Sequence, residues 1–302
     1  MKLVSLQRTL AASLLAGALA GCGSQVATKP SSGNAEEVAV TTALAGMPDM
    51  VSDDLFDVST QTALSSARGR IGIETAINPL YFWRTILGET PRFTIVFADT
   101  DSTGRPRTAL VVIDRHFLGR LNIVPGTTGH PDTANVVHKP LDDAWVRHLL
   151  LHRFDGEGAL HGWHVVGATG VDVTSRNATS AIQSVRVQTG TLDTLITDPL
   201  QLFPVGRCLR VAQGDSLQLT ATTSRTDDVV LAYWHDHRAP FHNNGDGTYS
   251  FTIRQSDMPG YRFFGVNALS NGTLFDDTLP YDSNAWIVHC LIGPPSPDPY
   301  YE

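Results

Sequence analysis

The sequence predicts an α+β domain followed by an all-β sandwich, with an export signal and a flexible tether in front of them. Hydrophobic residues make up 42% and charged residues 17% of the 302 residues, which is enough apolar material for folded cores and too little charge for a disordered chain. A chain of this length is close to the limit for one core, so two domains are expected. The spacing of apolar residues then changes from helical to alternating along the chain.

Changes in composition place the expected boundaries. Residues 23–46 are small and polar and contain no aromatic residue, so they can bury too little to offset the entropy of ordering. Two prolines and a glycine within 195–206 mark a break between patterned segments. We therefore expect a signal over 1–21, Cys22 and a tether over 22–46, an α+β domain over 47–203, and a β-sandwich over 204–302.

The N-terminus has the features of an export signal. Lys2 and Arg8 precede an apolar run over 10–18 that is much shorter than the roughly 20 residues of a membrane-spanning helix. The run ends in Leu19-Ala20-Gly21-Cys22, which resembles the lipobox of bacterial lipoproteins. The resemblance implies that Cys22 is acylated, for example with palmitate, and anchors the mature protein in the cell envelope. Gly23 in place of Asp resembles the pattern of lipoproteins sent to the outer membrane in enteric bacteria, so this membrane is favoured in a Gram-negative host.

Net charge argues against nucleic acid as a partner. The chain has 22 Lys and Arg against 30 Asp and Glu, a formal charge of -8, whereas nucleic-acid-binding domains are basic. Removing residues 1–21 takes away Lys2 and Arg8 and leaves 20 basic against 30 acidic residues. This charge opposes contact with an anionic lipid surface except through the anchor.

The expected α+β domain begins with helices. A Ser/Asp cluster suited to capping opens residues 50–58, and residues 74–87 place apolar side chains at helical spacing. Strands are expected at 92–98, 108–114, 117–124, 145–154, 162–168 and 180–187. Helices followed by a curved antiparallel sheet resemble the cystatin-like and NTF2-like folds in element order. The resemblance implies that the concave sheet can hold a small ligand, in an apolar pocket near Tyr81, Phe82 and Trp83.

The C-terminal part resembles an immunoglobulin-like module. Short alternating strands are expected at 209–211, 216–222, 229–234, 248–253, 261–269 and 285–290. The turn Asn243-Asn-Gly-Asp-Gly-Thr-Tyr249 resembles a signature of bacterial Ig-like modules, in which Asp-Gly supplies the tight turn and Tyr enters the core.

The cysteines separate into two roles. Once Cys22 is acylated, Cys208 and Cys290 remain as a pair in an oxidising compartment. They lie on the first and last strands of the expected sandwich, so we expect a disulfide between them. Two buried free thiols are the alternative, because strand geometry can keep the two residues too far apart to bridge.

Histidines suggest a metal site. His235 and His237 lie two residues apart on one face of an expected strand, and His242 is close by, a pattern that zinc sites use. The alternative is that this strand face runs out into solvent. His148, His152, His161 and His164 are similarly spaced, but the apolar residues between them favour a half-buried strand with polar tips.

Two loops are rich in oxygen ligands. Asp99-Thr-Asp-Ser-Thr-Gly104 begins like a calcium loop, but Leu110 stands where a bidentate Glu is needed, so a simple turn is favoured. Asp276, Asp277, Asp282 and Asn284 could hold calcium, although Asp and Asn also favour turns by themselves.

No motif of a common hydrolase, metalloprotease or nucleotide-binding enzyme is present, and no cofactor is expected. The sequence therefore favours a lipid-anchored envelope protein with a binding, adhesion or structural role, whose partner could be a protein or a glycan. One alternative is a metal-dependent envelope hydrolase using His235, His237 and His242. Another is the binding of a small ligand in the cavity of the α+β domain.

Overall fold

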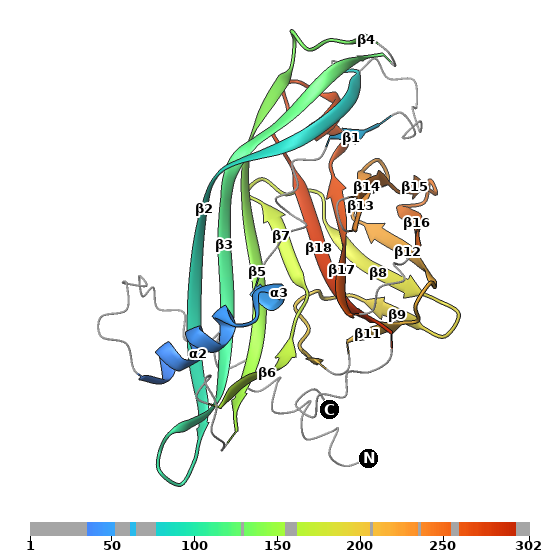
Figure 1. Cartoon of the computed structure of the whole chain (residues 1–302). Coiled ribbons are helices and arrows are strands. Elements are labelled where there is room, and N and C mark those ends of the chain that lie inside the picture. Colours follow the sequence, from blue (N-terminus) through green and yellow to red (C-terminus); the bar gives the residue numbers. More distant parts are fainter. Residues whose placement is uncertain are drawn as a thin grey trace.

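The structure is a computed structural model and describes residues 35–51, 61–64, 77–127, 130–154, 162–205, 208–234, 237–254 and 260–293. Within these ranges the protein is almost entirely β-sheet (Figure 1). The helices described are α2 (Ala35–Ala45), α3 (Pro48–Val51) and α4 (Asn271–Phe275). The strands described are β1 (Thr62–Ala63), β2 (Pro79–Thr100), β3 (Pro106–Thr127), β4 (His130–Pro131), β5 (Val137–Arg153), β6 (Trp163–Ala168), β7 (Val171–Ser175), β8 (Ile182–Gln188), β9 (Asp193–Ile196), β10 (Phe203–Pro204), β11 (Leu209–Val211), β12 (Ser216–Thr223), β13 (Val229–Trp234), β14 (His237–Pro240), β15 (His242–Asn243), β16 (Thr248–Arg254), β17 (Gly260–Leu269) and β18 (Ser283–Ile292).

One large, curved sheet dominates the fold. In the described part of the chain its strands run in the order β1-β2-β3-β5-β7-β18-β17-β13-β14, and each neighbouring pair is antiparallel. Strands β2 and β3 are 22 residues long and β5 is 17, and Figure 1 shows them arching along one side of the molecule, opposite β17 and β18.

The two ends of this strand order approach each other. Arg238 Nη1 on β14 donates a hydrogen bond of 3.3 Å to Thr62 Oγ1 on β1. The sheet therefore curls almost far enough to close on itself, and it encloses an interior into which α2 and α3 project (Figure 1).

A second, smaller sheet packs on the outside. It contains β15-β16-β12-β8-β9 and covers β13, β17 and β18, which therefore bury both of their faces. On β13, for example, Leu231 and Tyr233 join the interior core while Val230 and Ala232 join the core between the sheets. The two apolar cores are thus connected through shared strands.

The expected α+β domain with leading helices is wrong. The predicted helix over 74–87 is strand β2 from Pro79 onward. Its apolar residues match a helical spacing, but the segment is rich in aromatic and β-branched residues, which prefer a pleated surface. Every second residue, Phe82, Arg84 and Ile86, faces the interior. The burial of these side chains favours the strand over the helix. The strands predicted between 92 and 187 do form, but 108–114 and 117–124 are one continuous strand, β3.

Part of the expected tether is ordered. Residues 35–45, which the composition assigned to the tether over 22–46, form α2. Small residues let this helix approach the sheet closely: Ala39, Val40, Ala43 and Leu44 are buried in the interior core. The signal over 1–21 and Cys22 lie outside the described residues. No helix within the described ranges is long and apolar enough to cross a membrane.

The expected immunoglobulin-like sandwich does not stand as a separate module. Its strands form near the predicted positions, but β12 pairs with β8 and β18 pairs with β7. Each of the two sheets therefore contains strands from before and from after residue 203. A local alternating pattern predicts that a strand forms, whereas its partner depends on contacts far away in the sequence.

Candidate functional site

Strand β5 carries four ionisable side chains into the interior. Its odd-numbered residues are buried and the residues between them are more exposed, as the pleat of a strand requires. The buried row includes Lys139, Asp143, Arg147 and Arg153. Such side chains are almost never fully buried unless they are paired, so the partners of each one define what the interior can bind.

At the level of Arg153, the interior holds helix α2. Glu36 is 7% exposed, and its Oε1 accepts hydrogen bonds from Arg105 Nε at 2.8 Å and Arg153 Nη1 at 3.3 Å. Trp163 Nε1 donates to Oε2 at 3.0 Å, and Arg153 also pairs with Asp101. Burial opposes ionisation of Glu36, but the hydrogen bonds from Trp163 and Arg105 and the nearby guanidinium charges outweigh it and lower its pKa. Glu36 is thus an ionised anchor for α2.

At the level of Arg147, a buried cation has no counter-ion among the described residues. Arg147 Nη1 donates to the carbonyl oxygen of Met50 in α3, and Nη2 lies 3.1 Å from His289 Nδ1. Its Nε has no hydrogen-bond partner, and its contacts within the described residues include no carboxylate. Burial, and then the charge of Arg115, lower the pKa of Arg147 to about 9. Removing an ion from water without a counter-charge costs several kcal/mol.

Arg115 stands beside Arg147 and holds the same short helix. Its Nη2 donates to the carbonyl oxygen of Val51 at 2.6 Å, and its Nη1 lies 3.2 Å from Glu89 Oε1. The guanidinium also lies over the ring of Trp145, 5.0 Å from its centroid, and Trp145 Nε1 is buried without a hydrogen-bond partner. Hydrogen-bond donors therefore gather where α3 ends.

His289 is neutral at this level. Burial, and then the charge of Arg147, hold its pKa well below the usual value. Its ring meets Phe263 edge-on, with the centroids 5.9 Å apart. A neutral imidazole can accept a hydrogen bond from Arg147, but it cannot compensate the positive charge.

At the level of Asp143, a polar cluster lies beside a small cavity. Tyr281 donates a hydrogen bond of 3.0 Å to Asp143 Oδ2, while Oδ1 is buried without a partner. Arg84 Nη2 donates to Ser283 Oγ at 3.3 Å. Burial raises the pKa of Asp143 to about 6, although the charge of Arg84 opposes the shift. The cavity lies against β17 and β18, and its polar lining comes from Arg84, Tyr233 and Asn267.

Lys139 fixes α4 and the loop after it. Its Nζ donates to the carbonyl oxygens of Gly272 at 2.8 Å, Asp276 at 2.5 Å and Leu279 at 2.7 Å. Burial lowers its pKa to about 8, against the charges of Asp276 and Asp277. Three carbonyl acceptors use all three donors of the ammonium group, so the role of Lys139 is structural.

The expected histidine metal site is not assembled within the described residues. His235 lies outside them. His237, on β14, is exposed and packs on Trp234 with ring centroids 5.7 Å apart. His242, on β15, is exposed in the smaller sheet. The described ranges contain no cluster of three potential metal ligands. Neither the zinc site nor the hypothesis of a metal-dependent hydrolase is therefore supported by the described residues.

The second group of histidines lies on the outer face of β5 and β6. His152 and His164 are register partners, and the ring of Phe154 lies near both, at centroid distances of 6.5 and 5.6 Å. Burial lowers the pKa of His148 and of His152. His161 lies outside the described residues. The expectation of a strand with polar tips fits β5 here.

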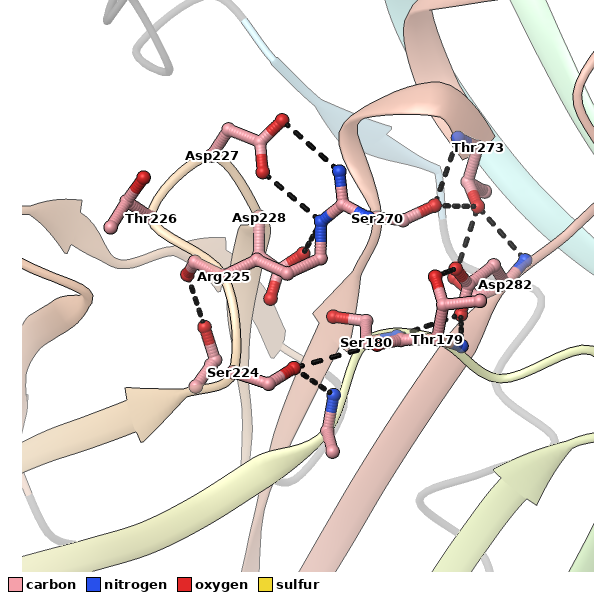
Figure 2. A network of polar contacts seen from close by, with 12 residues as sticks. Thr179, Ser180, Ser224, Arg225, Thr226, Asp227, Asp228, Ser270, Thr273 and Asp282 are labelled. Carbon is pink, nitrogen blue, oxygen red and sulfur yellow. Dashed lines mark hydrogen bonds and ion pairs between the residues drawn. The ribbon is translucent and has the colours of Figure 1, made fainter.

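The oxygen-rich loops use their oxygens internally. Asp101 Oδ1 accepts hydrogen bonds from Thr103 and Arg105, which makes the simple turn that was expected. Asp282 binds the backbone N–H groups of Thr179 and Ser180 at 2.9 and 3.2 Å, and Figure 2 shows it joining the segment before β8 to that before β18. The remaining candidates act similarly: Asp276 Oδ1 accepts from Thr278 and Leu279, and Asn284 Oδ1 accepts from Ile182.

Cys208 directly precedes β11, which neighbours β18, the strand that carries Cys290. β11 pairs in parallel with β18, with Leu209 opposite Cys290, which brings Cys208 next to the same strand. Both sulfurs are buried free thiols in the structure. Burial raises the pKa of Cys208 and, with the nearby Cys208 sulfur, that of Cys290 to about 12. The disulfide stays a prediction.

The cavity described above is not lined by Tyr81, Phe82 and Trp83, the residues near which an apolar pocket was expected. Phe82 fills the interior core, and Tyr81 and Trp83 stack on each other with centroids 6.2 Å apart. The cavity lies instead at Arg84, the next residue.

Sequence reasoning missed the interior arginines. Arg84, Arg115, Arg147 and Arg153 all stand within strongly apolar strands and share the parity of the inward-facing residues. That parity was a readable signal, because a charge at an inward position needs an explanation. For Arg84 this alternation could not be seen, because a helix was predicted over 74–87.

Comparisons with known proteins add no relative. No protein-family model matches the chain, and no curated protein or solved structure is significantly similar to it.

Proposed function

We propose that this chain is a lipid-anchored bacterial envelope protein that binds an anionic ligand inside its curved sheet, at Arg147. One observation carries the proposal. Arg147 is 0% exposed, has no carboxylate among its described contacts, and retains an Nε–H without an acceptor. Buried charges are otherwise paired, so an incoming anion would supply the counter-charge that Arg147 lacks among the described residues.

The surroundings of Arg147 support an anion rather than another kind of ligand. Arg115 adds a second guanidinium group, which pairs with Glu89 at 3.2 Å, and the Trp145 Nε1–H adds an unused donor. His289 is neutral and adds no negative charge. Two guanidinium groups and an indole N–H form the donor set that a carboxylate or phosphate group prefers.

The anchor explains where the binding would take place. The lipobox-like segment ending at Cys22 supports acylation and retention at a membrane of the envelope, with the outer membrane favoured in a Gram-negative host. Helix α2 begins 13 residues after this cysteine, so the lipid would hold the folded body close to the membrane surface. A protein or glycan partner on the outer surface would be compatible with the same anchor.

Titration of the whole chain with anions tests the proposal. The probes are inorganic phosphate and straight-chain monocarboxylates from acetate to palmitate, each carboxylate matched by the alcohol of equal length. We expect at least one anion to raise the melting temperature and to bind by calorimetry, whereas its uncharged match does not. An anion bound at 100 times its Kd stabilises a folded protein by about 2.7 kcal/mol.

Two variants locate the binding. Arg147→Gln should weaken it at least about tenfold, as expected for loss of a charged hydrogen-bond donor, and Arg147→Lys should restore part of it. Arg186→Gln removes an exposed arginine that pairs with Asp193 on the smaller sheet and should change nothing. If no anion binds, or if Arg147→Gln and Arg186→Gln bind equally, the proposed function is wrong.

A further inference from the structure

Residues 35–51, here called the strap, fill the interior beside Arg147 and are held at both ends by arginines. At the start, the carboxylate of Glu36 binds Arg105 and Arg153. At the end, the carbonyl oxygens of Met50 and Val51 accept hydrogen bonds from Arg147 and Arg115. Both ends therefore present oxygen atoms to guanidinium groups of the sheet.

The strap contacts the site with the same chemistry that an acidic ligand would use. A carbonyl oxygen is a neutral acceptor, whereas a carboxylate is ionised and can accept two parallel hydrogen bonds from one guanidinium. The carbonyl of Met50 thus stands in for an anionic oxygen: it accepts a hydrogen bond from Arg147 Nη1 but does not compensate the positive charge.

The middle of the strap covers an apolar wall with small side chains. Ala39, Val40, Ala43 and Leu44 pack in the interior core, to which Ile113 of β3 and Leu149 of β5 also belong. These residues give the helix little apolar surface of its own to bury.

The wall continues past the strap toward the edge of the sheet. Phe93, Ile95 and Phe97 on β2 are register partners of inward-facing residues of β3, and Phe93 is still 44% exposed. An apolar surface with room for more contacts therefore starts beside the two arginines. A cationic end joined to an apolar wall matches an acid with a hydrocarbon chain.

We infer that the ligand is a long-chain carboxylate and that it displaces the strap, its carboxylate replacing the Met50 carbonyl on Arg147 and its chain lying on the wall that α2 covers. This inference rests on the proposed function and adds the class of ligand and the means by which the site is kept closed. Without ligand, the strap closes the site and shields its apolar wall from water.

The test uses palmitate and the whole chain, and compares variants with opposite expected effects. Glu36→Gln removes the ionised anchor of the strap but no group of the site, so it should raise palmitate affinity about tenfold, since each tenfold corresponds to about 1.4 kcal/mol. Trp163→Phe removes one hydrogen bond to the same carboxylate and should raise affinity less. Asp193→Asn breaks an exposed ion pair on the smaller sheet and serves as the matched control without effect.

Hydrogen exchange gives a second readout. Palmitate should speed amide exchange in residues 35–45 while leaving β3 and β5 protected, and Glu36→Gln should do so even without ligand. If Glu36→Gln binds palmitate no more tightly than the wild type, or if palmitate slows amide exchange in residues 35–45, the inference that the ligand displaces the strap is wrong. If Arg147→Gln still abolishes binding in that case, the anion site stands and only its closure by the strap fails. Tight binding of phosphate or acetate in place of palmitate would overturn the long-chain class.

Discussion

Single residues decide what the interior of the curved sheet can do. The inward row of β5 alternates apolar side chains with Asp143, Arg147 and Arg153. Arg153 meets carboxylates and Asp143 meets Tyr281, whereas Arg147 meets only neutral groups within the described residues. The difference in partners, and not the presence of charge, distinguishes a structural arginine from a candidate binding arginine.

The buried carboxyl of Asp143 should make stability depend on pH. Its pKa is raised to about 6 from 3.8, mainly by burial, so the folded state keeps a proton that the unfolded state loses. The stabilising contribution is full below about pH 4 and is lost as pH rises through about 6. Asp143→Asn keeps the shape of the side chain and cannot ionise. Between pH 4 and pH 7 the wild type should therefore lose on the order of 3 kcal/mol of unfolding free energy relative to Asp143→Asn.

Urea unfolding of both proteins at several pH values measures this difference. His289 has the opposite sign, because its depressed pKa gives stability that is lost as pH falls below 6.5. It is present in both proteins and cancels in the comparison. A difference between wild type and Asp143→Asn that does not change with pH would show that Asp143 ionises normally in the folded state.

At the scale of elements, the sequence predicted strands better than their partners. The alternating segments around 229–234, 248–253 and 261–269 all became strands, because a period of two is a local property. The helix expected over 74–87 is wrong because the preference of Tyr81, Phe82 and Trp83 for strands outweighs the helical spacing of the apolar residues. The ordering of residues 35–45 could not be predicted from composition, since it depends on Glu36 meeting two arginines more than 60 residues away.

The pairing of β11 with β18 carries the prediction of a disulfide between Cys208 and Cys290. Such a bridge would close a loop of about 80 residues and stabilise the fold by on the order of 4 kcal/mol in the entropic account. Reduction should lower the melting temperature of protein exported by its host. Counting thiols in denatured, unreduced protein checks the bond directly, and two free thiols there would exclude it.

At the scale of the whole molecule, two sheets that each combine strands from before and after residue 203 should unfold as one. β7 and β8 lie before residue 203, yet they pair with β18 and β12. We therefore expect a single calorimetric transition in which the calorimetric and van't Hoff enthalpies agree. Two resolved transitions would restore the picture of separate domains divided near residue 203.

The anchor can be tested independently of the interior. If Cys22 carries the lipid, as we propose, Cys22→Ala should release the protein from membranes, because this one side chain would hold the acyl chains. The melting temperature should not change, because the residues around Cys22 are small and polar and can bury little apolar surface. Retention of Cys22→Ala in the membrane fraction at high salt would point instead to a protein partner or an uncleaved signal.

The most direct test of the interior anion site is a crystal structure of the whole chain with a long-chain carboxylate that carries bromine at its far end. The carboxylate should lie within hydrogen-bond distance of Arg147, about 3 Å, with the Met50 carbonyl displaced and the bromine signal near the apolar wall of β2 and β3. A ligand bound only on the outer face of either sheet, with Arg147 still on the Met50 carbonyl, would contradict the account.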